Sequence, residues 1–157
     1  MENRLTILSE SLDRKIQILE QIQKFNELQA EAFSRDNADL EEFDRGFEEK
    51  DKLINEMIRL DDGFDALYEE IAKELKDNRL KYAAQIKRLQ QKIEKVTELS
   101  VSIQTQEQRN KKLAEDYFTR ARNGIRQNRQ TSRAAYDYYR NMSGTAYSTS
   151  RIMDNKQ

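Results

Sequence analysis

Apolar residues recur at steps of three and four along most of the chain, which is the spacing of one helix face. The first stripe consists of Leu5, Leu8, Leu12, Ile16, Leu19 and Ile22, extended by Phe25, Leu28 and Phe33. It predicts a first helix over residues 2–34. Asp36 or Asn37 follows and can cap the next helix by accepting a backbone N–H.

A second stripe begins near Ala38. It consists of Leu40, Phe43, Phe47, Ile54 and Met57, with Lys50 filling one seam position. The segment Asp61–Gly63 resembles a break, because Asp caps helices and Gly loosens the backbone. The stripe nevertheless resumes in phase at Phe64, Leu67, Ile71 and Leu75. We therefore expect one helix over residues 37–76 with a kink near residue 62.

A reversal is expected at Asp77–Arg79, followed by a helix over residues 79–142 that is either continuous or broken at 104–112. Its first part carries Leu80, Tyr82, Ile86, Leu89, Ile93, Val96, Leu99 and Ile103. Beyond Ile103 the stripe thins to Asn110, Ala114, Tyr117, Ala121, Ile125, Asn128, Ser132, Ala135, Tyr139 and Met142. Ser143–Gly144 ends the pattern, and residues 143–157 are expected to form a flexible tail.

Helix lengths suggest how these elements fit together. At 1.5 Å per residue the three helices would measure about 48, 58 and 95 Å. The third helix would extend beyond the other two. Its C-terminal part is therefore expected to contribute least to a shared core. The predicted fold is all-α: an elongated antiparallel helical bundle or coiled-coil hairpin of three to four long helices, with a protruding C-terminal helix. Residues 1–142 would form a single domain.

Composition favours the same fold and narrows the chemistry. There is no Pro, and the charged and hydrophobic fractions are both 36%. The absence of Cys and His excludes disulfides, thiolate and imidazole metal sites, and Ser-His nucleophilic catalysis. We expect no enzyme activity, no cofactor and no metal. The N-terminus lacks the pattern of a secretion signal, and no apolar run is long enough to span a membrane, so a cytoplasmic protein is expected.

Charge is unevenly distributed. Residues 36–77 hold 16 acids and 6 bases, whereas residues 109–140 hold 9 bases and 3 acids. Arg122, Arg126, Arg129 and Arg133 step by four, three and four, and therefore form a stripe. The stripe could be a solvated face, pair with the acidic helix, or provide electrostatic contacts to an acidic partner.

The C-terminal quarter also holds the candidate partner-binding residues. These are the apolar and aromatic positions Leu113, Tyr117, Phe118, Ile125, Tyr136, Tyr139 and Met142. Tyr combines apolar area with a polar tip, which suits a surface that is exposed before binding. Packing within the chain is the alternative.

Several segments give the chain a family resemblance. They are Asp36-x-x-Asp39-Leu40-Glu41-Glu42-Phe43, Glu49-Lys50-Asp51-Lys52-Leu53-Ile54, Leu99–Gln104, Glu107–Leu113 and the ending Tyr138–Met142 with Ile152–Lys156. In these the chain resembles the FlgN-like flagellar export chaperones, which are small helical cytoplasmic proteins. The resemblance implies binding of hook–filament junction proteins before type III export, with the client held by the C-terminal helix between Leu113 and Met142.

The sequence thus favours a non-enzymatic export chaperone that shields an amphipathic client helix. Its expected partners are flagellar junction proteins and the export apparatus, with no nucleic acid and no stable membrane insertion. Two alternatives stay open: a structural coiled-coil scaffold that homodimerises through the same C-terminal segment, and a basic-helix nucleic-acid binder.

Overall fold

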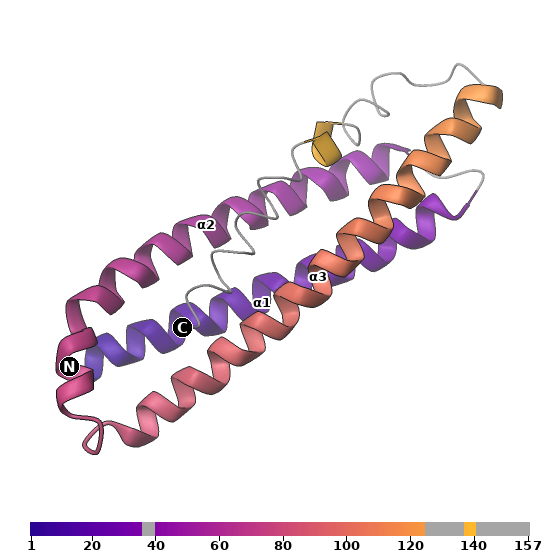
Figure 1. Ribbon diagram of the computed structural model, residues 1–157. Coiled ribbons are helices and arrows are strands. Elements are labelled where there is room, and N and C mark those ends of the chain that lie inside the picture. The colour runs from indigo at the N-terminus through magenta and orange to yellow at the C-terminus, as the bar shows by residue number, and fades with distance from the viewer. Residues whose placement is uncertain (36–39, 125–136, 141–157) are drawn as a thin grey trace.

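Three long helices lie side by side and form a rod (Figure 1). The computed structural model describes residues 1–35, 40–124 and 137–140. Its helices are α1 (Glu2–Phe33), α2 (Leu40–Asp77) and α3 (Ala83–Gly124), and residues 137–140 add one helical turn. The described residues contain no strand, so the predicted all-α helical bundle is confirmed. None of the described helices has an apolar stretch long enough to cross a membrane.

Side-chain pairs fix the helix directions. Between α1 and α3, Lys92 donates a hydrogen bond to the Ser9 hydroxyl, and Arg120 donates one to the backbone carbonyl of Phe33. These two helices therefore run parallel. Lys15 pairs with Asp61 of α2, whereas Gln29 bonds the earlier residue Lys50, so α1 and α2 are antiparallel. Both α2 and α3 pack along α1, while the described backbones of α2 and α3 stay farther from each other. Helix α1 is therefore the common support of the bundle.

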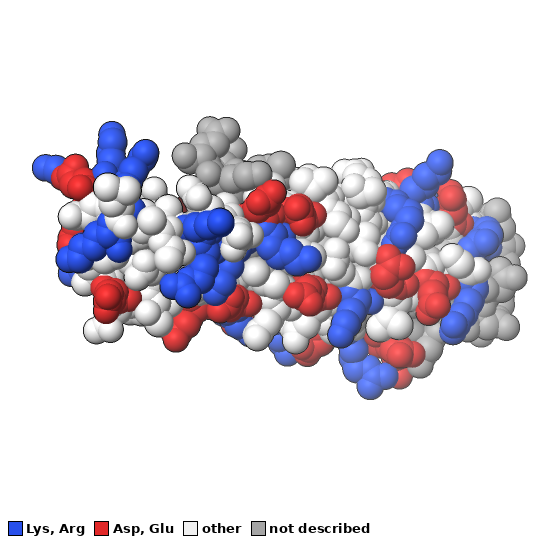
Figure 2. Space-filling model, turned by 90° about the horizontal axis from the view of Figure 1, so that it is seen from below, with Lys and Arg blue, Asp and Glu red and all other residues white. Residues whose placement is uncertain are grey.

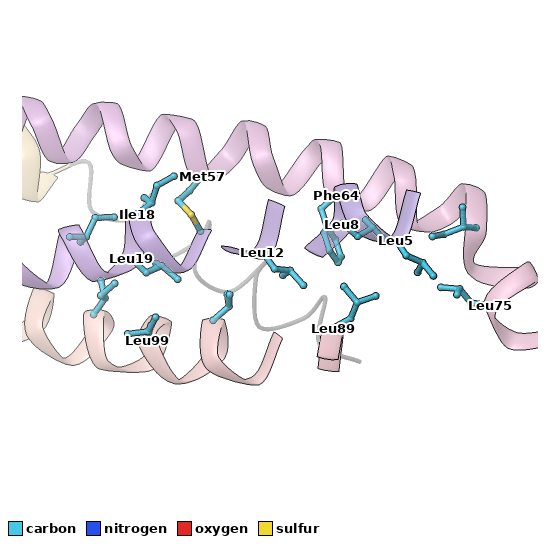
Figure 3. Packing of buried hydrophobic residues seen from close by; sticks show 14 of the residues in the cluster. Leu5, Leu8, Leu12, Ile18, Leu19, Met57, Phe64, Leu75, Leu89 and Leu99 are labelled. Atoms are coloured by element: carbon cyan, nitrogen blue, oxygen red, sulfur yellow. The ribbon is translucent and has the colours of Figure 1, made fainter. Parts of the chain in front are cut away.

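The core consists of two apolar clusters. The larger one follows the rod from Leu5 to Ile103, and its side chains point inward from all three helices (Figure 3). The smaller one is mainly aromatic and lies at the other end of α1. It consists of Phe33, Phe43, Phe47, Ala114, Tyr117 and Tyr138. We call this second cluster the aromatic end.

The buried face of α1 departs from the predicted stripe from Lys15 onward. Lys15, Asn26 and Gln29 are buried, whereas Leu28 is 61% exposed and Phe25 only half-buried. Leu28 was expected to extend the core stripe, and this expectation is wrong. The buried face of α1 includes polar residues at positions where side chains of α2 and α3 form hydrogen bonds with them.

Helix α2 continues without interruption through Asp61–Gly63. A kink near residue 62 rather than a full turn was predicted, and α2 is indeed one helix here, in which Asp61 does not act as a cap. It is buried inside α2, where its carboxylate lies 2.7 Å from Lys15 Nζ. Lys15 Nζ also lies 4.4 Å from the centre of the Phe64 ring. The ion pair thus keeps this polar position inside the helix interface.

Helix α3 begins at Ala83 rather than at residue 79, and residues 125–136 and 141–142 of the predicted 79–142 helix lie outside the described residues. The reversal expected at 77–79 is confirmed, although the turn continues to Tyr82 and leaves Leu80 outside the core. The helix is unbroken through 104–112, and Gly124 is its last described residue. Arg120 Nη2 still donates to the carbonyl oxygen of Phe33, 3.0 Å away, at the end of α1. The expected protrusion is therefore small within the described chain, and the proposed tail at 143–157 lies outside the described residues.

Candidate partner-binding site

Aromatic rings from all three helices meet at the aromatic end. Phe33 of α1 stacks on Phe43 of α2, with ring centres 4.6 Å apart. Tyr117 of α3 lies 5.8 Å from Phe33, and Tyr138 lies 4.7 Å from Phe47. Offset and edge-to-face contacts of this kind add to the burial of apolar area. The ends of the three helices are thereby fixed to one another.

A polar layer separates the aromatic end from the larger cluster. Glu107 Oε1 lies 2.7 Å from Lys50 Nζ and accepts a hydrogen bond of 2.8 Å from the hydroxyl of Tyr138. Lys50 also donates to Gln29 Oε1 at 3.0 Å, and its Nζ lies 4.2 Å from the centre of the Tyr138 ring. These four side chains come from α1, α2, α3 and the turn at 137–140. The layer therefore ties every described helical element together.

Burial is the largest influence on the pKa values of the titratable side chains in and beside this layer. It lowers the pKa of Lys50, and the charge of Glu107 opposes that shift. It raises the pKa of Tyr138 far above its ordinary value, with Glu107 acting in the same direction. Tyr139 is shifted the same way, because burial and then Glu107 both raise its pKa. Such tyrosines stay neutral at physiological pH, so the layer acts as a structural connection.

A groove runs between α1 and α2 beside the aromatic end. Its volume is about 360 Å³, which lies within the range of ligand pockets. Its lining residues are Phe25, Leu28, Gln29, Glu31, Ala32, Arg35, Glu42, Phe43, Arg45, Gly46 and Glu49. The floor is mostly apolar and the rim is charged.

One buried donor in this groove has no hydrogen-bond partner among the described residues: Nε2 of Gln29. Lys50 can only donate, so the Gln29 amide must present Oε1 to it and turn Nε2 away. A Cβ atom built on Gly46 would lie 3.7 Å from this Nε2 and 4.0 Å from a ring carbon of Phe25. Gly46 thus leaves the space beside the donor open.

The described part of the predicted C-terminal site is largely covered. Tyr117 is buried, and Leu113, Phe118 and Tyr139 are half-buried against the aromatic end. Packing within the chain, the alternative left open by the sequence, accounts for these four residues. Arg122 is exposed, as a solvated face requires. Ile125, Tyr136, Met142, Arg126, Arg129 and Arg133 lie outside the described residues.

Sequence reasoning missed most of the polar layer. Lys50 was placed on the seam, but Gln29 and Glu107 were not selected. A signal for Glu107 existed, because it lies four residues after Ile103 and three before Asn110 on the same helix face. A hydrophobic pattern alone does not predict that a carboxylate at such a position is buried.

The described chain has no group of acidic side chains arranged to hold a metal ion. The described chain is an all-α bundle with a groove between α1 and α2 at one end. Comparison with family models, curated proteins and solved structures finds no match.

Proposed function

We propose that this chain is a flagellar export chaperone that binds an amphipathic helix of a hook–filament junction protein and keeps the client unassembled before type III export. The family resemblance of the sequence and the elongated helical bundle both support the proposal. The observation that carries it is the groove between α1 and α2, where apolar walls surround the unused donor of Gln29.

The walls suit an apolar side chain. Phe25 and Phe43 line the two sides, and Leu28 lies at the edge with 61% of its surface exposed. Phe43 is held in place from behind by Phe33 and Tyr117, so the wall is rigid before a partner arrives. A preformed apolar wall lowers the ordering cost of binding.

The donor suits the end of a helix. The last four carbonyl groups of any α-helix have no intrahelical partner. A client helix that ends over Gly46 brings such a carbonyl to Gln29 Nε2, while its last apolar residue enters between the Phe rings. The client segment that occupies the groove is therefore the C-terminal end of an amphipathic helix.

This placement moves the main contact from the C-terminal residues to the α1–α2 groove. Tyr117 and Tyr139 then act indirectly, because Tyr117 packs against Phe43 and Tyr139 packs against Phe33, which stacks on Phe43. The exposed Arg122 stays available for an acidic part of the client.

Co-expression with each hook–filament junction protein, followed by pull-down, tests the proposal. The discriminating variant is Gly46→Leu, which fills the groove with a side chain that favours helix. Gly46→Ala is the matched control, since its Cβ meets only ordinary contacts. We expect capture by the wild type and by Gly46→Ala, and loss of capture by Gly46→Leu.

Two outcomes would count against the proposal. If the wild type captures no junction protein, the chaperone assignment fails. If Gly46→Leu captures the client as well as Gly46→Ala does, the groove is not the site. Light scattering of the purified chain separates the scaffold alternative, which requires a tight dimer that is lost on deleting residues 113–157.

A further inference from the structure

The turn between α2 and α3 presents one apolar side chain at the tip of the rod. Leu80 is 95% exposed, the largest value among the exposed apolar side chains of the described chain. The turn around it is well defined. Asn78 Nδ2 donates to the carbonyl of Glu74 at 2.8 Å, and the amide of Tyr82 donates to the carbonyl of Asn78 at 3.2 Å. Leu80 is thus presented by an ordered backbone.

Basic side chains surround this leucine. Residues 73–88 contain six bases and two acids. The bases are Lys73, Lys76, Arg79, Lys81, Lys87 and Arg88, and all six are exposed. None of them forms an ion pair with another described residue. Blue side chains project from this end of the rod, on the left in Figure 2.

The shape of this end of the rod indicates which kind of surface the α2–α3 turn can contact. The turn lies at the extremity of the rod, beside the N-terminus (Figure 1). The groove between α1 and α2 lies around Phe25 and Leu28, toward the other end of α1. A convex tip with a single apolar side chain fits a broad, deformable surface better than a folded partner, which would need a matching pocket.

We infer that the α2–α3 tip binds the surface of an anionic phospholipid membrane. Leu80 enters the interfacial layer, while Arg79 and Lys81 extend their charged ends to the lipid phosphates. The remaining four bases add long-range attraction to the negative surface. One leucine is too little for insertion, so binding is peripheral, reversible and weakened by salt.

This contact leaves the proposed client groove away from the bilayer. Helix α2 has 38 residues, so its two ends are about 57 Å apart. The groove lies near the start of α2 and the tip follows its end. Membrane contact therefore does not compete with client binding, and it does not depend on the proposed function.

Co-sedimentation with vesicles tests the inference. The full chain is mixed with vesicles of phosphatidylcholine alone or of phosphatidylcholine with phosphatidylglycerol, at low and at physiological salt. We expect binding to the anionic vesicles only, decreasing with salt. Arg79→Glu combined with Lys81→Glu should reduce the partition coefficient at least about tenfold. Leu80→Ser should reduce it several-fold.

Matched controls distinguish an effect of the tip residues from a general effect of net charge or of exposed apolar side chains. Lys111→Glu with Lys112→Glu makes the same change in net charge on exposed residues of α3. Leu28→Ser removes an exposed leucine elsewhere. Both controls should bind within about twofold of the wild type. Equal losses in the controls, binding to neutral vesicles, or binding to polyuridylate RNA in place of anionic vesicles would overturn the inference.

Discussion

At the scale of single residues, the polar layer determines how the aromatic end is held. Lys50 and Glu107 are both buried and paired with each other. Lys50 also contacts Gln29 and the ring of Tyr138, and Glu107 accepts a hydrogen bond from the Tyr138 hydroxyl. Burying two charges is costly, and their attraction and hydrogen bonds offset that cost only while both are present. The pair therefore specifies which residues face one another more than it adds stability.

Removing the charge of Glu107 should destabilise the protein strongly. Glu107→Gln leaves Lys50 buried without a counter-charge, and we expect a loss of about 3–5 kcal/mol in the free energy of unfolding. The double variant Lys50→Met with Glu107→Leu removes both charges and should lose less. Urea denaturation followed by circular dichroism measures both. A double variant less stable than the single one would contradict this account.

The two neighbouring tyrosines should respond in opposite ways to the same substitution. Tyr138→Phe removes a hydrogen bond to a carboxylate and should cost about 1.5–3 kcal/mol. The buried hydroxyl of Tyr139 has no hydrogen-bond partner among the described residues, so Tyr139→Phe should be neutral or slightly stabilising. Thermal unfolding of the two variants checks the contrast. A larger loss for Tyr139→Phe would contradict it.

The same tyrosines predict a dependence on alkaline pH. In the unfolded chain they ionise near pH 10, whereas burial raises the pKa of Tyr139 in the folded chain. The folded state then binds more protons, so this contribution is present below about pH 10 and is lost as the pH rises further. Tyr139→Phe should lose less stability than the wild type between about pH 9 and pH 11. Parallel slopes for the two proteins would contradict the shift.

At the scale of the helices, much was predictable from periodicity. The stripes on α1, α2 and the first half of α3 place most of the larger cluster, because apolar residues at helical spacing must bury one face. Periodicity did not reveal that Asp61 or Gln29 is buried. Their burial depends on partners in other helices, Lys15 and Lys50, and a single stripe carries no information about them.

Helix α2 also carries a glycine whose substitution should stabilise it. A Cβ on Gly63 would meet no atom within 4 Å, and the residue is exposed within the helix. Gly63→Ala should raise the free energy of unfolding by up to about 1 kcal/mol through helix propensity. Differential scanning calorimetry should show a melting temperature higher by about 2–4 °C. A decrease would mean that α2 requires flexibility at this position.

At the scale of the whole molecule, the rod has two different ends. One end carries the aromatic cluster and the α1–α2 groove, and the other carries Leu80 among exposed bases. The sequence pointed to the C-terminal quarter as the partner surface, because its stripe is thin and its predicted helix long. The groove could not be predicted, since it arises where Gly46 of α2 faces Phe25 and Gln29 of α1.

Titration calorimetry with a purified junction protein tests the central claim most directly. The wild type and Gly46→Ala should bind the client with similar affinity. Gly46→Leu, with an unchanged circular dichroism spectrum, should bind at least about tenfold more weakly, equivalent to about 1.4 kcal/mol. Equal affinity of all three proteins would show that the client does not occupy the α1–α2 groove.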